Sequence, residues 1–253
     1  MLRSLVFYFL LFLSLSMLNL QPVQSQDAEE ILLNMEEVMR GDVLHAEMTM
    51  TIVRPRYERE VSIRSWLKGR DYSMILITAP SRDRGTAFLM RGNNIWNYDP
   101  RIDRTTRMPS SMMAQSWMGS DFTNDDLVRD SDIIDDYEHR VLRTEDYEGR
   151  KCYVIESIPK PESAIVWGKV KMWIATDTYI QLRMEQYDQR DRLINEIKFD
   201  EIRSFGDREL PSRMTVLPVE KENHRTVLFY QKMDFEIDID QEFFSLENMQ
   251  RLN

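Results

Sequence analysis

The stretch EMTMTIVRPRYEREVSIRSWL (47–67) alternates apolar and polar side chains along both of its halves. Met48 and Met50 alternate with threonines in the first half, and Val61 and Ile63 alternate with polar or charged residues in the second. A period of two with one apolar face is typical of antiparallel strands that bury one side and expose the other. The stretch therefore predicts a pair of half-buried antiparallel strands.

The same pattern recurs toward the C-terminus, where Val227, Phe229 and Met233 are predicted to share a buried face. Glycine-containing turn motifs separate the apolar runs at 68–71, 91–94, 147–150 and 205–207. Most predicted strands have no helix between them, and the chain contains no internal repeat or linker. The sequence predicts one mainly β (α+β) domain over residues 26–253, built as an antiparallel meander.

Two segments break the period of two and predict helices. In 27–40, Ile31, Leu32 and Met35 recur at helical spacing, and the apolar segment Ser110–Gly119 is predicted to be a second helix. Thr123 and Asp126 would cap a further short helix. A sheet with one apolar face must be covered or must close around something. We therefore predict a half-open antiparallel β-barrel with a helical lid.

The first 25 residues have the order of a cleavable export signal. Arg3 precedes an apolar run, Leu5–Leu20, and Val23 and Ser25 occupy the small-residue positions before a cleavage site. The alternative is an uncleaved anchor, but the run is shorter than the ~20 residues that span a bilayer. We predict a signal peptide at 1–25 and a mature protein in the periplasm.

The charge and the cysteine content argue against a nucleic-acid-binding protein, an internal disulfide and a lipid anchor. The formal net charge is −10, and loss of the signal removes one cation, Arg3, and no acid, which gives −11. Such a surface repels nucleic acid and anionic bilayers, so no nucleic-acid partner is expected. The single cysteine, Cys152, can neither form an internal disulfide nor serve as a lipid anchor directly after the signal.

Catalytic and metal-binding motifs are absent from the sequence. His45, His139 and His224 lack metal-ligand spacing, and no phosphate-binding motif is present. Ser65 and Lys68 match the SxxK motif only formally, because they fall at the end of a predicted strand and in a turn rather than on one face of a helix. The acids of 121–138 do not fit a calcium loop and are interpreted as helix-capping and solvated residues. We predict no catalysis, no cofactor and no metal.

Methionine is the most unusual feature, with 17 residues in the chain and a cluster around Trp117. Its flexible side chain suits surfaces that accept variable apolar partners. Ordinary core packing is the alternative. The predicted cavity and lid residues are Met35, Met50, Phe88, Met90, Trp96, Met112, Met113, Trp117, Met118 and Phe122.

A local excess of arginine precedes the acidic segment. One interpretation is that these arginines balance the negative charge of the acidic segment. The other is that they form a rim that holds an anionic lipid headgroup, namely Arg82, Arg84 and Arg91. Both roles are compatible with the charge pattern.

Three motifs carry a resemblance to a family: PSRDRGTAFL (80–89), NIWNYDP (94–100) and SWMGSDFTNDDL (116–127). With the signal, the opening helix and the later strands, they resemble the LolA-like outer-membrane lipoprotein-sorting proteins, in their uncharacterised branch. The resemblance implies an incomplete β-barrel, closed on its concave side by helices, that shields an acyl chain. The founding carrier's lid-locking arginine is not matched to a residue here, so lipoprotein, phospholipid and other lipids remain open as cargo.

The interpretation is a monomeric periplasmic carrier that shuttles the acyl chain of a lipid or lipoprotein between membranes. The resemblance also implies an inner-membrane transporter and an outer-membrane acceptor as partners. A periplasmic lipid-sensing regulatory module on the same scaffold is the alternative.

The export signal gives the first prediction. Protein recovered from the periplasm should begin near Gln26 and carry no lipid, because the segment before it is removed on export. Intact-mass measurement tests this, and a mass that retains Leu5–Leu20 would contradict it.

Overall fold

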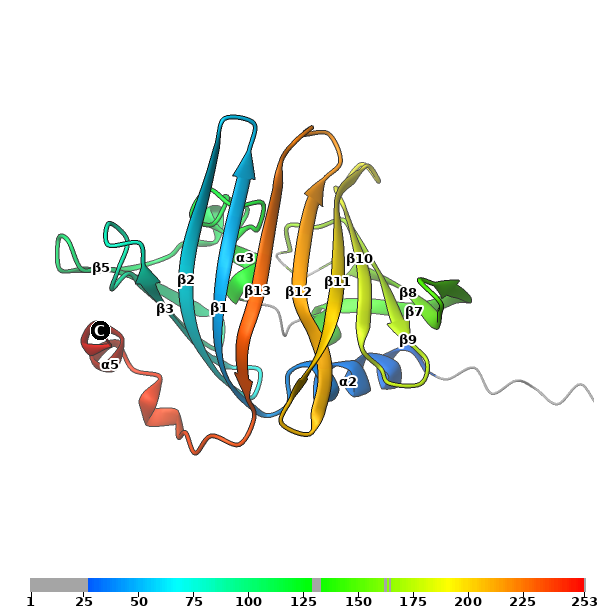
Figure 1. Ribbon diagram of the computed structural model, residues 1–253, viewed down its shortest axis with the longest axis horizontal. Helices are drawn as coiled ribbons and strands as arrows, with labels where there is room; N and C mark the ends of the chain where they lie inside the picture. The colour runs from blue at the N-terminus through cyan, green and yellow to red at the C-terminus, as the bar shows by residue number, and fades with distance from the viewer. Residues whose placement is uncertain (1–26, 129–132, 162, 164, 253) are drawn as a thin grey trace, which may run out of the picture.

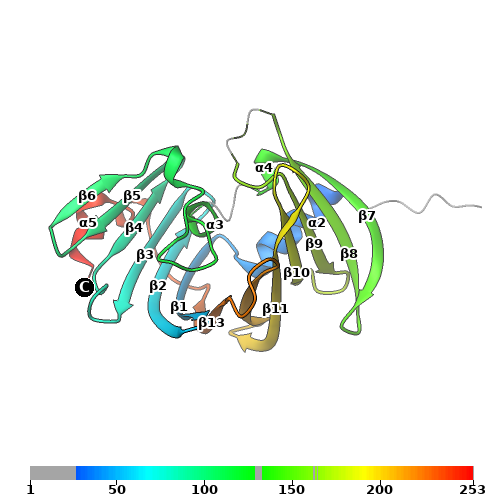
Figure 2. The same cartoon turned by 90° about the horizontal axis from the view of Figure 1, so that it is seen from above.

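The computed structural model describes residues 27–128, 133–161, 163 and 165–252. The predicted signal segment, 1–25, lies outside the described residues. The part of the chain that is described forms a 13-stranded antiparallel sheet with a few short helices. The sheet curves into an open half-barrel, seen from the side in Figure 1 and from above in Figure 2. The predicted half-open antiparallel barrel is confirmed.

The strands follow one another as a meander. Their bounds are β1 Val43–Arg54, β2 Tyr57–Lys68, β3 Tyr72–Ala79, β4 Ala87–Arg91, β5 Asn94–Asp99, β6 Arg104–Arg107, β7 Tyr137–Tyr147, β8 Arg150–Pro159, β9 Lys169–Ala175, β10 Gln181–Tyr187, β11 Leu193–Phe205, β12 Arg208–Pro218 and β13 Arg225–Asp234.

One long-range ladder joins the two halves of this meander. The order across the sheet is β6-β5-β4-β3-β2-β1-β13-β12-β11-β10-β9-β8-β7. The first and last strands, β1 and β13, thus pair at the middle, and β6 and β7 become the two edges. In Figure 2 the halves curve as two wings around a common interior.

The four predicted turns all form hairpins. Gly69, Gly92, Gly149 and Gly206 lie in them with φ of +52°, +50°, +81° and +64°. Glycine adopts this left-handed region without the steric cost that a side chain brings. Local turn chemistry therefore sets these strand connections.

Helix α2 (Ala28–Met39) lies on the concave side of the sheet (Figure 2). The Asp27 side chain caps it by accepting from the Glu29 N–H at 3.2 Å. Ile31 and Leu32 are fully buried, and they pack with residues of β8 and β9 such as Ile155. The predicted N-terminal helix is confirmed.

The predicted helix Ser110–Gly119 is wrong. A single 3₁₀ turn, η1 (Ser110–Met112), is followed by a tight loop in which Met118 and Gly119 have φ of +50° and +79°. The Trp117 N–H donates to the Phe122 carbonyl at 2.8 Å, so the chain turns back on itself. Burial of Trp117, which is 1% exposed, outweighs the local helical pattern.

Two short helices follow this loop. In α3 (Asn124–Val128) the Thr123 hydroxyl accepts from the Asp126 N–H at 3.1 Å, while the Asp126 carboxylate accepts from the Thr123 N–H at 2.7 Å. The predicted capping pair is confirmed. Helix α4 (Ile133–Asp136) then leads into β7.

A bulge in β13 changes which of its residues face inward. Tyr230 pairs with Met48 and Lys232 pairs with Glu47, so Gln231 is the extra residue. Leu228 and Tyr230 therefore share the concave face before the bulge, and Met233 joins them after it. The prediction that Val227 and Phe229 share a buried face with Met233 is wrong, because a bulge inverts the period of two.

The C-terminal segment 235–252 covers the convex side of one wing. It contains η2 (Gln241–Phe243) and α5 (Leu246–Arg251), which contacts β4. Phe244 and Met249 are fully buried against Leu89 and its neighbours on β3 and β5. Figure 2 shows α5 on the outer side of this wing. The wing is thus buried on both faces.

This packing gives the second prediction. Phe244→Ala should lower the free energy of unfolding by about 3–5 kcal/mol, because it removes a fully buried aromatic side chain. Leu246→Ala is the matched control, since Leu246 is 40% exposed. Denaturant unfolding measures both, and equal effects would show that the segment is not anchored by Phe244.

Candidate functional site

A cavity of about 270 Å³ lies on the concave side of the sheet. Residues of α2, of β1 to β4, of β9 to β13 and of the loop before α3 line it. Its volume is close to the lower end of the range of roughly 300–1,000 Å³ found for ligand pockets. The curvature that follows from the β1–β13 ladder thus encloses a mainly apolar space.

Methionine is the main adaptable component of the wall. Seven lining methionines come from α2 and five strands: Met35, Met39, Met48, Met90, Met184, Met214 and Met233. Unbranched thioether side chains adjust to ligands of different shape. Most of these residues are far apart in the sequence, so their common location was not visible in the local cluster around Trp117.

Four of the predicted cavity residues line the cavity: Met35, Met90, Trp117 and Phe122. Two others, Met50 and Phe88, do not line the cavity but are buried in the same hydrophobic cluster as the lining residues Met48 and Ile63. The Phe88 and Trp117 rings lie 5.5 Å apart between centroids. These six residues therefore lie on the concave side of the sheet.

The remaining four predicted residues lie elsewhere. Met112 and Met113 pack around Met90 and Ile95, and Met118 is partly buried against the main cluster. The helix predicted over Ser110–Gly119 would have placed Met113 and Trp117 one turn apart on the same face, and the structure has only a 3₁₀ turn at Ser110–Met112.

Trp96 pairs with Leu89 across β4 and β5, which places it on the convex face with the C-terminal segment.

The three arginines of the predicted headgroup rim are exposed and do not line the cavity. Arg82 and Arg84 precede β4, whereas Arg91 ends it. A strand rises about 3.3 Å per residue, so the two groups are separated by roughly the length of β4. Arg82 lies 3.5 Å from Asp83.

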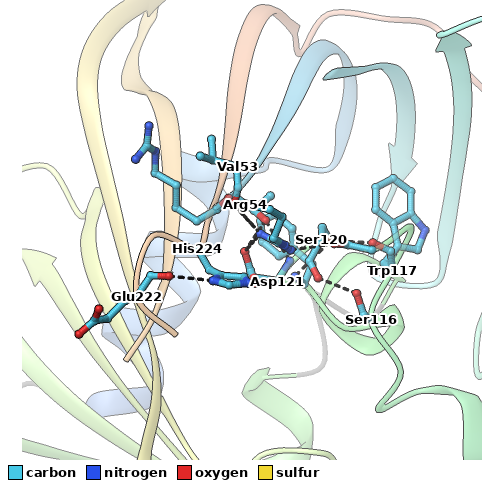
Figure 3. Close-up of polar contacts among 12 residues, drawn as sticks. Val53, Arg54, Ser116, Trp117, Ser120, Asp121, Glu222 and His224 are labelled. Atoms are coloured by element: carbon cyan, nitrogen blue, oxygen red, sulfur yellow. Dashed lines mark hydrogen bonds and ion pairs between the residues drawn. The ribbon is translucent and has the colours of Figure 1, made fainter. Parts of the chain in front are cut away.

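The segment 113–123, called the Trp117 loop, carries two lining aromatic residues and is held by an arginine from β1. Arg54 donates to Asp121 Oδ2 at 2.9 Å and to the Gly119 carbonyl at 2.7 Å. The two side chains are only 10% and 4% exposed. Figure 3 shows Arg54 reaching Asp121, with Trp117 on the other side of the loop. This ion pair fixes the loop across the top of the sheet.

Further contacts strengthen this attachment. Arg59 donates to the Met118 carbonyl at 3.2 Å and to Asp83 Oδ2 at 2.6 Å. The Thr226 hydroxyl donates to Asp121 Oδ2 at 2.7 Å. Sequence reasoning missed Arg54 and Arg59, because nothing in a period-two pattern distinguishes an arginine that reaches across a hairpin from a solvated one.

A second ionic cluster holds the opposite end of the cavity. Glu36 on α2 accepts from Arg70 at 2.6 Å and from Arg40 at 3.2 Å, and Arg70 also reaches Asp135 at 3.1 Å. Hydrogen bonding to Glu36 raises the pKa of Arg70 above its usual value. The cluster joins α2, the β2–β3 turn and α4. Arg40 also donates to the Gly69 carbonyl at 2.5 Å.

A third polar group lies within the cavity wall. Asp126 Oδ1 accepts from Trp167 Nε1 at 2.9 Å and from Gln186 Nε2 at 3.1 Å. The Gln186 oxygen in turn accepts from Asn195 at 3.0 Å. All of these donors are neutral, so the wall contains a carboxylate held by uncharged hydrogen bonds.

The single cysteine of the chain, Cys152, is buried. Burial raises the pKa of the Cys152 thiol to about 11, so this side chain stays protonated at neutral pH.

Among the described residues there is no group of three acidic, histidine or cysteine side chains placed to hold a metal ion. No helix in the described part of the chain is long and apolar enough to cross a membrane.

The curved sheet, the helix on its concave face and the apolar cavity define a class of β-rich proteins with an enclosed hydrophobic interior. A family model described as an uncharacterized protein matches residues 69–251. No curated protein sequence matches the chain. The family-model match spans more than half of the chain and shows that the chain belongs to that family, while the solved structures below show a LolA-like fold.

Three solved structures are similar over 88% of this chain. A DUF1329 family protein from Desulfovibrio piger is 24% identical with a TM-score of 0.81, over 98% of its own length. A putative outer membrane lipoprotein-sorting protein domain from Vibrio parahaemolyticus is 22% identical with a TM-score of 0.80, also over 98%. A LolA superfamily protein from Nitrosomonas europaea is 22% identical with a TM-score of 0.76, over 99%. At these identities the likeness shows the fold.

The loop attachment gives the third prediction. Arg54→Met should speed hydrogen exchange of the 113–123 amides at least about tenfold, because Asp121 loses its buried partner. Arg91→Met is the matched control, since Arg91 is exposed and does not line the cavity. Unchanged exchange of the Trp117 and Ser120 amides in Arg54→Met would show that the ion pair does not hold the loop.

Proposed function

We propose that the protein is a non-catalytic periplasmic carrier whose cavity binds the acyl chain of a lipid or lipid-modified protein. The observation that supports this most directly is the apolar concave wall with its seven methionines, built from both wings of the sheet. Burial of an acyl chain contributes about 0.8 kcal/mol per methylene, or on the order of 12 kcal/mol for a sixteen-carbon chain. A wall of this kind therefore supplies enough binding free energy.

Delivery requires that part of this free energy be offset. The Trp117 loop and α2 cover apolar wall in the empty protein, and cargo competes with them for the same surface. Besides their apolar packing, each is held by an ion pair and not by the sheet ladder: Arg54 with Asp121 at one end and Arg70 with Glu36 at the other. Displacement of these two elements lowers the net affinity and allows release.

The remaining parts of the proposal concern location and partners. Residues 1–25 act as the export signal, and the described residues form the single carrier domain of the mature protein. The cargo is received from a transporter or bilayer at the inner membrane and is delivered to an acceptor at the outer membrane. The mature protein works as a monomer.

Two serines on the concave wall allow a test, which is the fourth prediction. Ser65 is 7% exposed and lines the cavity, so Ser65→Phe should fill it and weaken binding of a fluorescent fatty-acyl probe at least about tenfold. Transfer of that probe between two vesicle populations should fall in parallel. Ser62→Phe is the matched control, because Ser62 does not line the cavity and lies on the other face of β2.

Thermal unfolding of both variants shows whether the fold is intact. If Ser65→Phe unfolds, Ser73→Leu replaces it, since Ser73 lines the same cavity from β3. Equal binding by wild type and both cavity variants would contradict the proposal. Binding that never leads to transfer would instead favour a lipid sensor.

A further inference from the structure

We infer that the cavity binds the polar end of its cargo as well as the chain, and that this end is an uncharged, hydroxyl-bearing group. The inference rests on the proposed function and deepens it by naming the class of cargo. It is carried by two buried polar side chains on the cavity wall and by the charge of that wall.

Gln181 is the first of these side chains. It begins β10, is 5% exposed and lines the cavity. Its Nε2 is buried and has no hydrogen-bond partner among the described residues. A buried amide that is left unbonded destabilises a fold, so its presence in the wall of a cavity indicates a ligand that bonds to it.

A neighbour on the same strand shows the contrast. Gln186 also lines the cavity, but its amide donates to Asp126 and accepts from Asn195. The fold therefore satisfies one glutamine of β10 with its own side chains and leaves the Nε2 of the other without a partner. Structural and ligand-binding roles are thus separated on one strand.

Trp117 is the second such side chain. It is 1% exposed, lines the cavity, and its Nε1 has no hydrogen-bond partner in the described part of the chain. An indole N–H donates only, so its partner must be an acceptor such as a hydroxyl or carbonyl oxygen. The amide of Gln181 both donates and accepts. A hydroxyl group, which also does both, is complementary to either side chain.

The charge of the wall is unfavourable for an anionic end at the α3 side of the cavity. Asp125 and Asp126 line the cavity from α3, directly after the Trp117 loop. The basic residue that lines it, Arg40, is bonded to Glu36 and to the Gly69 carbonyl, and no lysine is among the described lining residues. A carboxylate or phosphate inside the cavity would face these acids without a free cation.

Two ligands with the same twelve-carbon acyl group test the inference: monolauroylglycerol, which is uncharged and hydroxyl-bearing, and dodecanoate. Each is titrated against the protein loaded with the neutral fluorescent probe N-phenyl-1-naphthylamine. Monolauroylglycerol should displace the probe at a concentration at least about tenfold lower than dodecanoate does. Displacement at equal concentrations would overturn the inference.

Matched glutamine substitutions give the residue-level test, which is the fifth prediction. Gln181→Met should weaken monolauroylglycerol binding about fivefold while the thermal midpoint of the empty protein is unchanged or higher, because an unbonded donor is removed. Gln186→Met should lower that midpoint by at least about 2 °C, because Gln186 donates to Asp126 and accepts from Asn195. A lowered midpoint and unchanged binding in Gln181→Met would assign it a structural role and overturn the inference.

The outcomes separate the inference from the proposed function. If neither ligand displaces the probe, the cavity does not bind apolar chains and the proposed function fails. If both displace it equally and Ser65→Phe abolishes the effect, the proposed function stands and the inference is wrong.

Discussion

The antiparallel ladder between β1 and β13 is the constraint on which the rest of the structure depends. It pairs Met50 with Leu228 and Ile52 with Thr226, strands that are separated by most of the chain. Without it, the meander would be two independent sheets, each with an exposed apolar face. With it, the twist of successive strands accumulates in one direction and bends a single sheet around an interior.

A bent sheet with two free edges leaves its concave face only partly covered, and the cavity is the consequence. Helix α2 covers the wing that ends at β7, and the Trp117 loop covers the other wing from above. Ion pairs hold both covers: Arg70 with Glu36 for the helix and Arg54 with Asp121 for the loop. The hydrogen-bonded sheet is therefore the frame of the fold, and the covers are attached to it by ion pairs and by buried side chains such as Leu32 and Trp117.

Sequence reasoning was most successful where structure is local. The hairpin turns at Gly69 and Gly149 and the α2 helix after Asp27 were predicted, because turn chemistry, capping and periodicity act over a few residues. It failed at the Trp117 loop, where burial of one indole and an ion pair to a distant strand outweigh a helical pattern. It also failed in β13, since the bulge at Gln231 inverts the side-chain alternation.

The sequence by itself determined the antiparallel meander and the opening helix. Only the tertiary structure decided which residues face the cavity: Met184 and Met214 line it, whereas Trp96 lies on the convex face beneath the C-terminal segment. The physical reason is that alternation fixes two sides of a strand but not which side becomes concave. That choice depends on strand register and on the β1–β13 pairing, which join residues far apart in the chain.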